Sequence, residues 1–255
     1  LALLIFGILS LTSIQPTERH REYRLDSPAL YDGLLFRERT WNPLAASADQ
    51  GLKDEFGSSM PVARRGWWVS RRTDRQLEIQ VSARGKTTKM SALLGLDPQE
   101  TKLTPLTACL TGDFLAHGSA RECLLPLPRA QTLGVLPGDS VTISGAAFTL
   151  VGIFDPARLA KITDLDGESL MPVDFKASAA SRVIEETESS PEAAPKAFLH
   201  QQASDVAMVT FESLKGLGGD LQSLAVGSPD PESLRTRLQP LVTRLDVLVY
   251  AGLAG

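Results

Sequence analysis

The spacing of apolar and polar residues places helices near both ends of the chain. Leu52 and Phe56 lie four residues apart with charged residues between them, which predicts a short amphipathic helix over 48–56 that ends at Gly57. Apolar residues recur at helical spacing over 231–245, which predicts a second helix with one apolar face. Apolar segments flank both helices and predict strands over 29–37, 61–72, 205–211, 221–226 and 247–250. Each end of the chain therefore reads as a β-α-β unit.

The middle of the chain is richer in strand patterns. Apolar and polar residues alternate with period two from Leu77 to Ser82, and a hairpin over 76–94 would turn at Arg84-Gly85-Lys86. A second hairpin joins 141–144 to 147–154 through Gly145. Between them, a short strand at 123–126 precedes a helical turn over 128–133 that ends at Gly134, and the segment 177–196, rich in Ala, Ser, Glu and Pro, is either a linker or a surface helix.

The composition is that of an ordinary folded protein and excludes few functional classes. Hydrophobic residues make up 43% of the 255 residues and charged residues 22%, which is ordinary for a folded globular protein. The net charge of −4 gives no basic footprint for nucleic acid. The three histidines lie far apart in the sequence, which argues against a histidine-rich catalytic or zinc centre. No cofactor is expected.

The two cysteines, Cys109 and Cys123, have no metal-ligand spacing. A disulfide between them would close a loop of about 15 residues and stabilise the fold by about 3 kcal/mol in the chain-entropy model. It would also imply an oxidising compartment. Two small buried thiols are the preferred interpretation.

Both ends of the chain are apolar. Residues 1–14 carry no charge, but a helix needs about 20 residues to span a bilayer. This run is interpreted as a signal-peptide core, a buried helix, or the outer end of a transmembrane helix, and the last is favoured. Residues 251–255 are expected to begin a further membrane segment. The chain would then be a domain between two membrane helices.

The segment 161–175 raises the question of catalysis, because four carboxylates stand close together there, namely Asp164, Asp166, Glu168 and Asp174. A calcium loop of the EF-hand type needs the pattern D-x-[DN]-x-[DN]-G followed by a distal Glu. Here Gly167 comes directly after the second Asp, and no distal Glu is in register. An acid/base pair would need a partner nucleophile, and none is evident. We expect no metal site and no catalytic residue here, and we interpret the segment as a turn built on Asp166-Gly167.

Gly66-Trp67-Trp68 is bracketed by arginines, and we expect one tryptophan to be in the core and the other to be exposed. Trp67, Trp68 and Arg71 are the candidate surface for a partner or client. The chain has no G-x-S-x-G nucleophile elbow and no P-loop. The sequence therefore predicts that the protein is not an enzyme.

A series of short motifs in the middle of the chain resembles the extracytoplasmic domain of MacB-like and FtsX-like ABC-transporter permeases. The motifs are Arg121-Glu-Cys-Leu-Leu-Pro126, Leu133-Gly134, Pro137-Gly-Asp139, Val141-Thr-Ile143 and Phe148-Thr-Leu-Val-Gly-Ile153. The resemblance extends over roughly residues 15–245 and is most specific over 93–153. Asp113 departs from the family pattern, which has a basic residue at that step.

The resemblance implies an α+β fold in which the two β-α-β units from the chain ends form a porter-like subdomain with a β-rich inserted subdomain. The expected divisions are the end of a transmembrane helix at 1–14, the first porter-like part at 15–99, the inserted subdomain at 100–176, a linker at 177–200, the second porter-like part at 201–250 and the next membrane segment at 251–255.

The resemblance also implies a function. It predicts a non-catalytic domain on the periplasmic side of the inner membrane, anchored in that membrane through flanking helices. The domain would couple cytoplasmic ATP hydrolysis to the export or extraction of a lipoprotein, a peptide or a small amphiphile. The implied partners are a cytoplasmic ATPase subunit or domain, a second permease and a periplasmic or lipoprotein client, with no nucleic acid.

Two other classes compete with this prediction. One is a free-standing secreted hydrolase or other enzyme, which would need a catalytic constellation that the sequence does not display. The other is a lipoprotein-like ligand-binding protein, which would need a Cys near the N-terminus, and residues 1–22 contain none.

Overall fold

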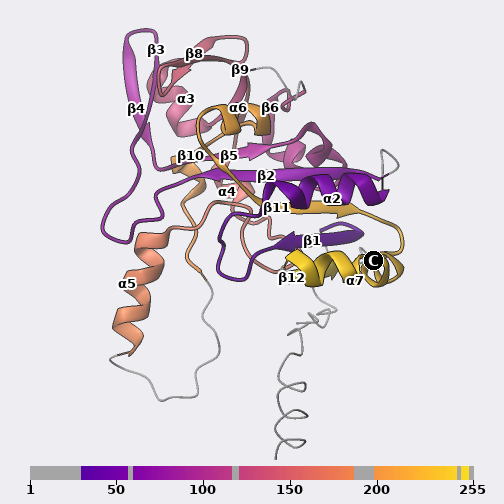
Figure 1. Cartoon of the computed structure of the whole chain (residues 1–255). Helices are drawn as coiled ribbons and strands as arrows, with labels where there is room; N and C mark the ends of the chain where they lie inside the picture. Colours follow the sequence, from indigo (N-terminus) through magenta and orange to yellow (C-terminus); the bar gives the residue numbers. More distant parts are fainter. Residues whose placement is uncertain (1–29, 57–59, 117–120, 187–197, 246–247, 253–255) are drawn as a thin grey trace, which may run out of the picture.

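The computed structural model describes residues 30–56, 60–116, 121–186, 198–245 and 248–252. Its strands form one continuous mixed sheet in the order β12-β1-β11-β2-β5-β10-β7-β9-β8-β3-β4, with β6 paired to β9. Helices and loops cover the faces of this sheet (Figure 1). The mixed α+β fold class expected from the sequence is confirmed.

The two ends of the chain build one four-stranded end of the sheet, which we call the terminal unit. It consists of β1 (Gly33–Arg37), α2 (Ala46–Phe56), β2 (Val62–Trp68), β11 (Asp220–Gly227), α7 (Pro231–Leu245) and β12 (Leu248–Gly252). Strand β11 lies between β1 and β2, and β1 lies between β11 and β12, each pair antiparallel. The two β-α-β units are thus interleaved in one sheet, as in a split β-α-β arrangement.

The apolar faces of the two helices explain why the terminal unit folds. Leu34 and Phe36 of β1 share a buried cluster with Leu52 of α2 and with Leu234 and Leu238 of α7. The helices expected over 48–56 and 231–245 are confirmed with slightly different bounds for the first. Because side chains alternate along a strand, the intervening residues of β1 face the other side of the sheet.

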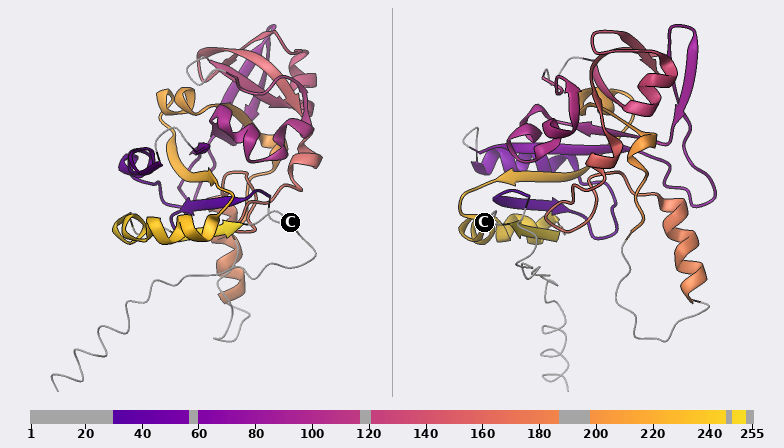
Figure 2. Two further views of the ribbon diagram at one scale, coloured as in Figure 1. Left: turned by 90° about the vertical axis from the view of Figure 1, so that its right-hand side faces the viewer. Right: turned by 180° about the vertical axis from the view of Figure 1, so that it is seen from behind.

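The chain between β2 and β11, which we call the inserted segment (residues 69–219), extends the sheet beyond β2. Its strands are β3 (Ile79–Ala83), β4 (Lys86–Met90), β5 (Ala92–Leu96), β6 (Leu110–Gly112), β7 (Glu122–Pro126), β8 (Ser140–Ile143), β9 (Ala146–Phe154) and β10 (Val206–Thr210). Its helices are α3 (Leu127–Leu133), α4 (Pro156–Leu159), α5 (Phe175–Glu186) and α6 (Phe211–Gly216), with 3₁₀ turns η1 (Pro98–Lys102), η2 (Pro105–Cys109) and η3 (Ala203–Asp205). Figure 2 shows the strands β3, β4, β8 and β9 gathered away from α7 and β12.

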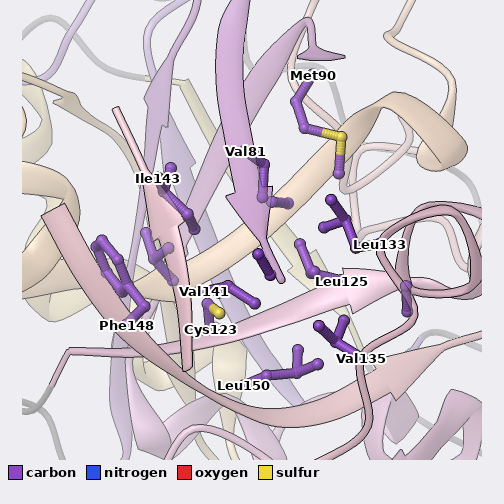
Figure 3. Packing of buried hydrophobic residues seen from close by; sticks show 14 of the residues in the cluster. Val81, Met90, Cys123, Leu125, Leu133, Val135, Val141, Ile143, Phe148 and Leu150 are labelled. Atoms are coloured by element: carbon purple, nitrogen blue, oxygen red, sulfur yellow. The ribbon is translucent and has the colours of Figure 1, made fainter. Parts of the chain in front are cut away.

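A second apolar core lies inside this far end of the sheet (Figure 3). Val81 and Met90 from one hairpin pack with Val141 and Ile143 from the other, and Leu133 of α3 closes the cluster. Helix α3 ends at Gly134, whose φ of 71° is left-handed and favours glycine. The predicted helical turn and its glycine stop are confirmed.

The hairpin expected over 76–94 is confirmed only in part. Strands β3 and β4 pair around Arg84-Gly85, but β4 ends at Met90, and Ala92–Leu96 forms the separate strand β5 in the middle of the sheet. The chain changes direction at Ser91, whose N–H donates to the carbonyl oxygen of Asp205 at 2.8 Å. The sequence pattern predicts one strand across Ser91, because the pattern does not show where the pairing partner of the chain changes.

The segment expected to be a linker or a surface helix contains the helix α5 up to Glu186, and its remainder, 187–197, lies outside the described residues. Cys109 and Cys123 are both buried free thiols, as preferred from the sequence. Burial raises the pKa of each thiol, most strongly for Cys123.

Two membrane segments were expected, one at each end of the chain. Residues 1–14 lie outside the described residues. Ala251 and Gly252 were expected to begin a membrane segment, but they are the last residues of β12, paired with Leu34 and Gly33 of β1. Because their backbones pair with β1, Ala251 and Gly252 belong to the sheet. Within the described ranges, no helix is both long and apolar enough to cross a membrane.

Candidate functional site

The acidic segment folds as a turn against the terminal unit. The N–H of Asp164 donates to the carbonyl oxygen of Glu168 at 2.8 Å, and the N–H of Gly167 donates to that of Asp164 at 2.9 Å. Gly167 has a φ of 80°, a left-handed conformation suited to glycine. The turn expected on Asp166-Gly167 is confirmed, and the remaining question is what its carboxylates contact.

Asp164 lies in a buried ion-pair cluster with Arg65 of β2. The carboxylate of Asp164 accepts from Nη1 of Arg65, and the carboxylate of Glu100 in η1 accepts from Nη2 at 2.8 Å and from Nε at 3.0 Å. All three side chains are at most 7% exposed. The guanidinium of Arg65 therefore joins β2 to two loops of the inserted segment at once.

Asp166 makes a similar contact with β1, which is separated from β2 by β11. Its carboxylate accepts from Nε of Arg37 in β1 at 2.6 Å. In the sheet register Arg37 stands opposite Ser223 of β11, and Ser223 stands opposite Arg65 of β2. The two arginines therefore lie on the same face of the sheet, with β11 between their strands. The acidic turn packs on this face.

The cluster holds three carboxylates against two guanidinium groups. Burial raises the pKa of Asp164, while Arg65 opposes that shift. Burial disfavours the charged form of Arg65, but Asp164 and Glu100 outweigh burial, so the pKa of Arg65 is well above its usual range. The phenol of Tyr31 is buried beside these groups, and desolvation followed by the charge of Asp164 raises its pKa.

The other two carboxylates of the segment have partners of their own. The carboxylate of Glu168 lies 2.9 Å from Nε2 of His200, whose Nδ1 lies 2.5 Å from the carbonyl oxygen of Met171. Asp174 accepts from the N–H of Ala177 at 2.9 Å and so begins α5. The four carboxylates thus fasten the segment at four places. Among the described residues, no three metal-binding side chains are grouped so that they could hold an ion.

The three residues proposed as a partner surface lie in different environments. Trp67 is 4% exposed and belongs to the core, so its ring is not available to a partner in this structure. Trp68 is half-buried against the far core. Arg71 is also half-buried, donates from Nη1 to the carbonyl oxygen of Trp41 at 2.7 Å, and lies 5.1 Å from the ring centroid of Phe175. Only Trp68 and Arg71 retain exposed area.

Trp41 is the residue that the sequence interpretation missed. Its ring lies 4.7 Å from that of Trp67, and the guanidinium carbon of Arg37 lies 4.2 Å from its ring centroid. The φ of Trp41 is 62°, which is unusual for a bulky residue. In this backbone conformation the ring contacts Trp67 of β2 and Arg37 of β1. No periodic pattern could have revealed this contact.

Comparison with known proteins identifies the fold. No protein-family model and no curated protein matches the chain. The periplasmic region of MacB from Actinobacillus actinomycetemcomitans is similar in structure, with a TM-score of 0.51 and 11% identity over 88% of this chain and 90% of that chain. The extracellular domain of the noncanonic ABC-type transporter YknZ from Gram-positive bacteria has a TM-score of 0.46 and 14% identity over 85% of this chain and 97% of that chain.

These similarities bear on the resemblance noted in the sequence. The fold expected from the permease-like motifs is the fold observed, because the chain shares it with the MacB periplasmic region. The motifs have structural roles: Gly134 ends α3, and Asp139 accepts from the N–H of Leu136 at 2.8 Å and from Arg84 at 2.9 Å. The chain therefore has the fold of an ABC-transporter permease periplasmic domain.

Proposed function

We propose that the chain is the extracytoplasmic domain of an ABC-transporter permease of the inner membrane. The domain is non-catalytic and couples cytoplasmic ATP hydrolysis to the export or extraction of a client, such as a lipoprotein, a peptide or a small amphiphile. The fold shared with the MacB periplasmic region supports this proposal as an analogy at the level of fold. A geometric feature of the terminal unit gives it further support.

That feature is the pairing of the first described strand with the last. Strands β1 and β12 are antiparallel neighbours, and Gly33, where β1 begins, stands opposite Gly252, where β12 ends. The chain therefore enters and leaves the sheet at one place. This arrangement suits a domain set between two membrane helices, because a movement of one helix against the other would act directly on two paired strands.

The buried ion-pair cluster offers a path for such a movement. Arg37 and Arg65 belong to the terminal unit, and their partners Asp166, Asp164 and Glu100 belong to the inserted segment. Ion pairs in a low-dielectric interior hold two rigid parts in one geometry. If β1 and β2 moved, the acidic turn would move with them, because the ion pairs prevent the strands from sliding past it.

The partners follow from the same proposal. An ATPase subunit or domain acts from the cytoplasm, a second permease completes a dimer, and a periplasmic or lipoprotein client binds the outer domain. Of the surface suggested by the sequence, Trp68 and Arg71 are the residues that keep exposed area for a client.

The location of the domain can be tested in cells that express the whole gene product containing this chain. Leu136 is 67% exposed, so a Leu136→Cys variant presents a thiol on the surface, whereas Cys109 and Cys123 are buried and serve as a background of unreactive thiols. A maleimide that crosses the outer membrane but not the inner one should label the variant in intact cells. Labelling only after the inner membrane is permeabilised would contradict the proposal.

The coupling role needs a separate measurement. An ATPase should copurify with the whole gene product, and ATP turnover by that complex should respond to the client. The purified chain itself should show no turnover of ester, peptide or phosphate substrates. Reproducible turnover that a point substitution abolishes would favour a secreted hydrolase instead.

A further inference from the structure

Strand β4 is an open edge of the sheet. Among the described strands it pairs only with β3. The two-residue turn at Arg84-Gly85 makes Ala83 and Lys86 the first hydrogen-bonded pair, so alternate residues of β4 bond to β3. The N–H and C=O groups of Thr87 and Lys89 therefore point away from β3, and no other described residue bonds to them.

A cleft of about 740 Å³ continues from the C-terminal end of this edge. Its walls are the segment 74–78, the start of α5 and the segment 199–202, and β4 contributes Lys89 and Met90. Leu77 and Leu199 give the cleft an apolar part, and Leu199 is 46% exposed. A strand added to β4 would therefore run into a partly apolar cleft.

Two carboxylates in the cleft pair with cations, and a third is held by uncharged partners. Glu78 lies 2.7 Å from Lys89, Asp205 contacts Arg129, and Asp174 begins α5 and accepts from Gln76 at 2.8 Å. Each of these carboxylates is therefore occupied by a partner within the described chain.

The mouth of the cleft keeps a positive surplus. Asp74 is held by Arg72 at 2.7 Å, which lowers the pKa of that carboxyl, and Arg75 and Lys176 add to the shift from nearby. Within the described ranges, neither Arg75 nor Lys176 has an ion-pair partner. Asp174 has only uncharged partners in the described chain, Gln76 and the Ala177 N–H, so three cations face two carboxylates at the opening of the cleft.

We infer that the β4 edge and this cleft bind an extended acidic peptide segment of another protein as an additional strand. The peptide backbone bonds to Thr87 and Lys89, an apolar side chain enters between Leu77 and Leu199, and a carboxylate meets Arg75 and Lys176. This mode of binding is β-strand addition, in which the backbone supplies affinity and alternate side chains supply specificity. The inference does not depend on the proposed transport function.

A second copy of the chain is the other natural occupant of an open edge. Pairing β4 with itself would line up Lys86 and Lys89 of both copies along one short ladder. Lysines on an edge strand oppose this kind of self-association. They do not oppose a strand that carries carboxylates, so the charge pattern favours the acidic peptide.

The inference can be tested with a fluorescent octapeptide of alternating Glu and Val, titrated with the full chain while anisotropy is recorded. Saturable binding that weakens with added salt is expected, and a Lys and Val octapeptide should not bind. Reversing both mouth charges with Arg75→Glu and Lys176→Glu should weaken binding by about tenfold or more. A matched control with Lys102→Glu and Lys161→Glu changes the same net charge at exposed positions outside the cleft and should leave binding unchanged.

The edge is tested by Thr87→Pro, which removes an N–H that bonds to no strand and should abolish binding while the thermal unfolding curve is kept. Should that variant not fold, hydrogen exchange on the unaltered chain decides the matter, because the peptide should protect the Thr87 and Lys89 amides. Absence of saturation at about 1 mM peptide would overturn the inference. Equal binding by the mouth-charge variant, or a dimer in sedimentation that Thr87→Pro disperses, would overturn it as well.

Discussion

The two faces of the terminal sheet are held by different forces. On one face, Leu34, Phe36 and Leu224 pack against α2 and α7 in an apolar cluster. On the other, Arg37 and Arg65 are buried under the acidic turn in ion pairs. The same strand β1 serves both faces, because its residues alternate. Hydrophobic burial gives the first face its stability. On the second face, the ion pairs offset the cost of desolvating the charges, and their fixed geometry defines where the inserted segment packs.

The largest effect should come from removing the cation of the charged face. Arg65→Met leaves Glu100 and Asp164 buried without their shared guanidinium, which should cost about 4 kcal/mol of unfolding free energy. Urea denaturation followed by circular dichroism measures this loss. Arg65→Lys is the matched control, and it should recover part of the loss, because it keeps the charge but not the fork that binds two carboxylates. A loss below about 1 kcal/mol in Arg65→Met would mean that the cluster is hydrated rather than buried.

The apolar face should respond somewhat less. Leu52 is 1% exposed in the cluster between α2 and β1, so Leu52→Ala should cost about 3 kcal/mol through lost burial and the cavity left behind. Leu52→Met keeps the volume and should cost less than half as much. The two variants can be compared in the same urea experiment. Equal losses in both would contradict the argument that lost volume at this position sets the cost.

The sequence revealed the apolar face far better than the charged one. The helix over 231–245 follows from local periodicity, because its apolar residues recur at spacings of three and four, and Leu234 and Leu238 lie in the apolar cluster. Arg37 and its partner Asp166 are 129 residues apart, and Arg65 and Asp164 are 99 apart, so no local pattern links them. The carboxylates of the segment 161–175 were visible, and their interpretation as a turn was right. Their partners become known only once β1 and β2 lie beneath the turn.

The domain divisions illustrate the same limit. Composition suggests a β-rich region, but strand pairing is decided by contacts between distant segments. Ala92–Leu96 reads as the return strand of a hairpin, yet β5 pairs with β2 and with β10. The expected divisions at 99, 176 and 200 remain predictions. The contact of Trp41 with Trp67 could not be anticipated either, because the two residues belong to different segments and no periodic pattern links them.

A smaller and pH-dependent effect is expected from Asp164→Asn. The cluster carries one carboxylate more than its cations balance, and burial raises the pKa of Asp164 above the ordinary 3.8. A group whose pKa is raised on folding gives stability that is present below its unfolded pKa and is lost as the pH rises through the folded value. Asparagine does not titrate, so the variant avoids this loss.

At about pH 7 the Asp164→Asn variant should therefore lie within about 1 kcal/mol of the unaltered chain, although an ion pair has been removed. Its stability relative to the unaltered chain should increase from about pH 4 to about pH 7, measured by urea denaturation at each pH. Asp205→Asn, at the half-buried pair with Arg129, serves as a control outside the cluster. A relative stability that instead falls with rising pH would mean that Arg65 lowers the pKa of Asp164 on balance.

The smallest effect should come from an ion pair of the same length on the surface. Lys89 and Glu78 lie 2.7 Å apart, much like the 2.8 Å between Arg65 and Glu100, but their side chains are 68% and 66% exposed rather than 4% and 0%. Lys89→Gln should change the unfolding free energy by less than about 0.5 kcal/mol, because water screens the pair and solvates whichever partner remains. Glu78→Gln should give the same result, whereas a loss above about 1 kcal/mol in either variant would contradict the comparison. Distance is matched between the two pairs, so the difference between this variant and Arg65→Met reflects burial together with the second carboxylate that Arg65 binds.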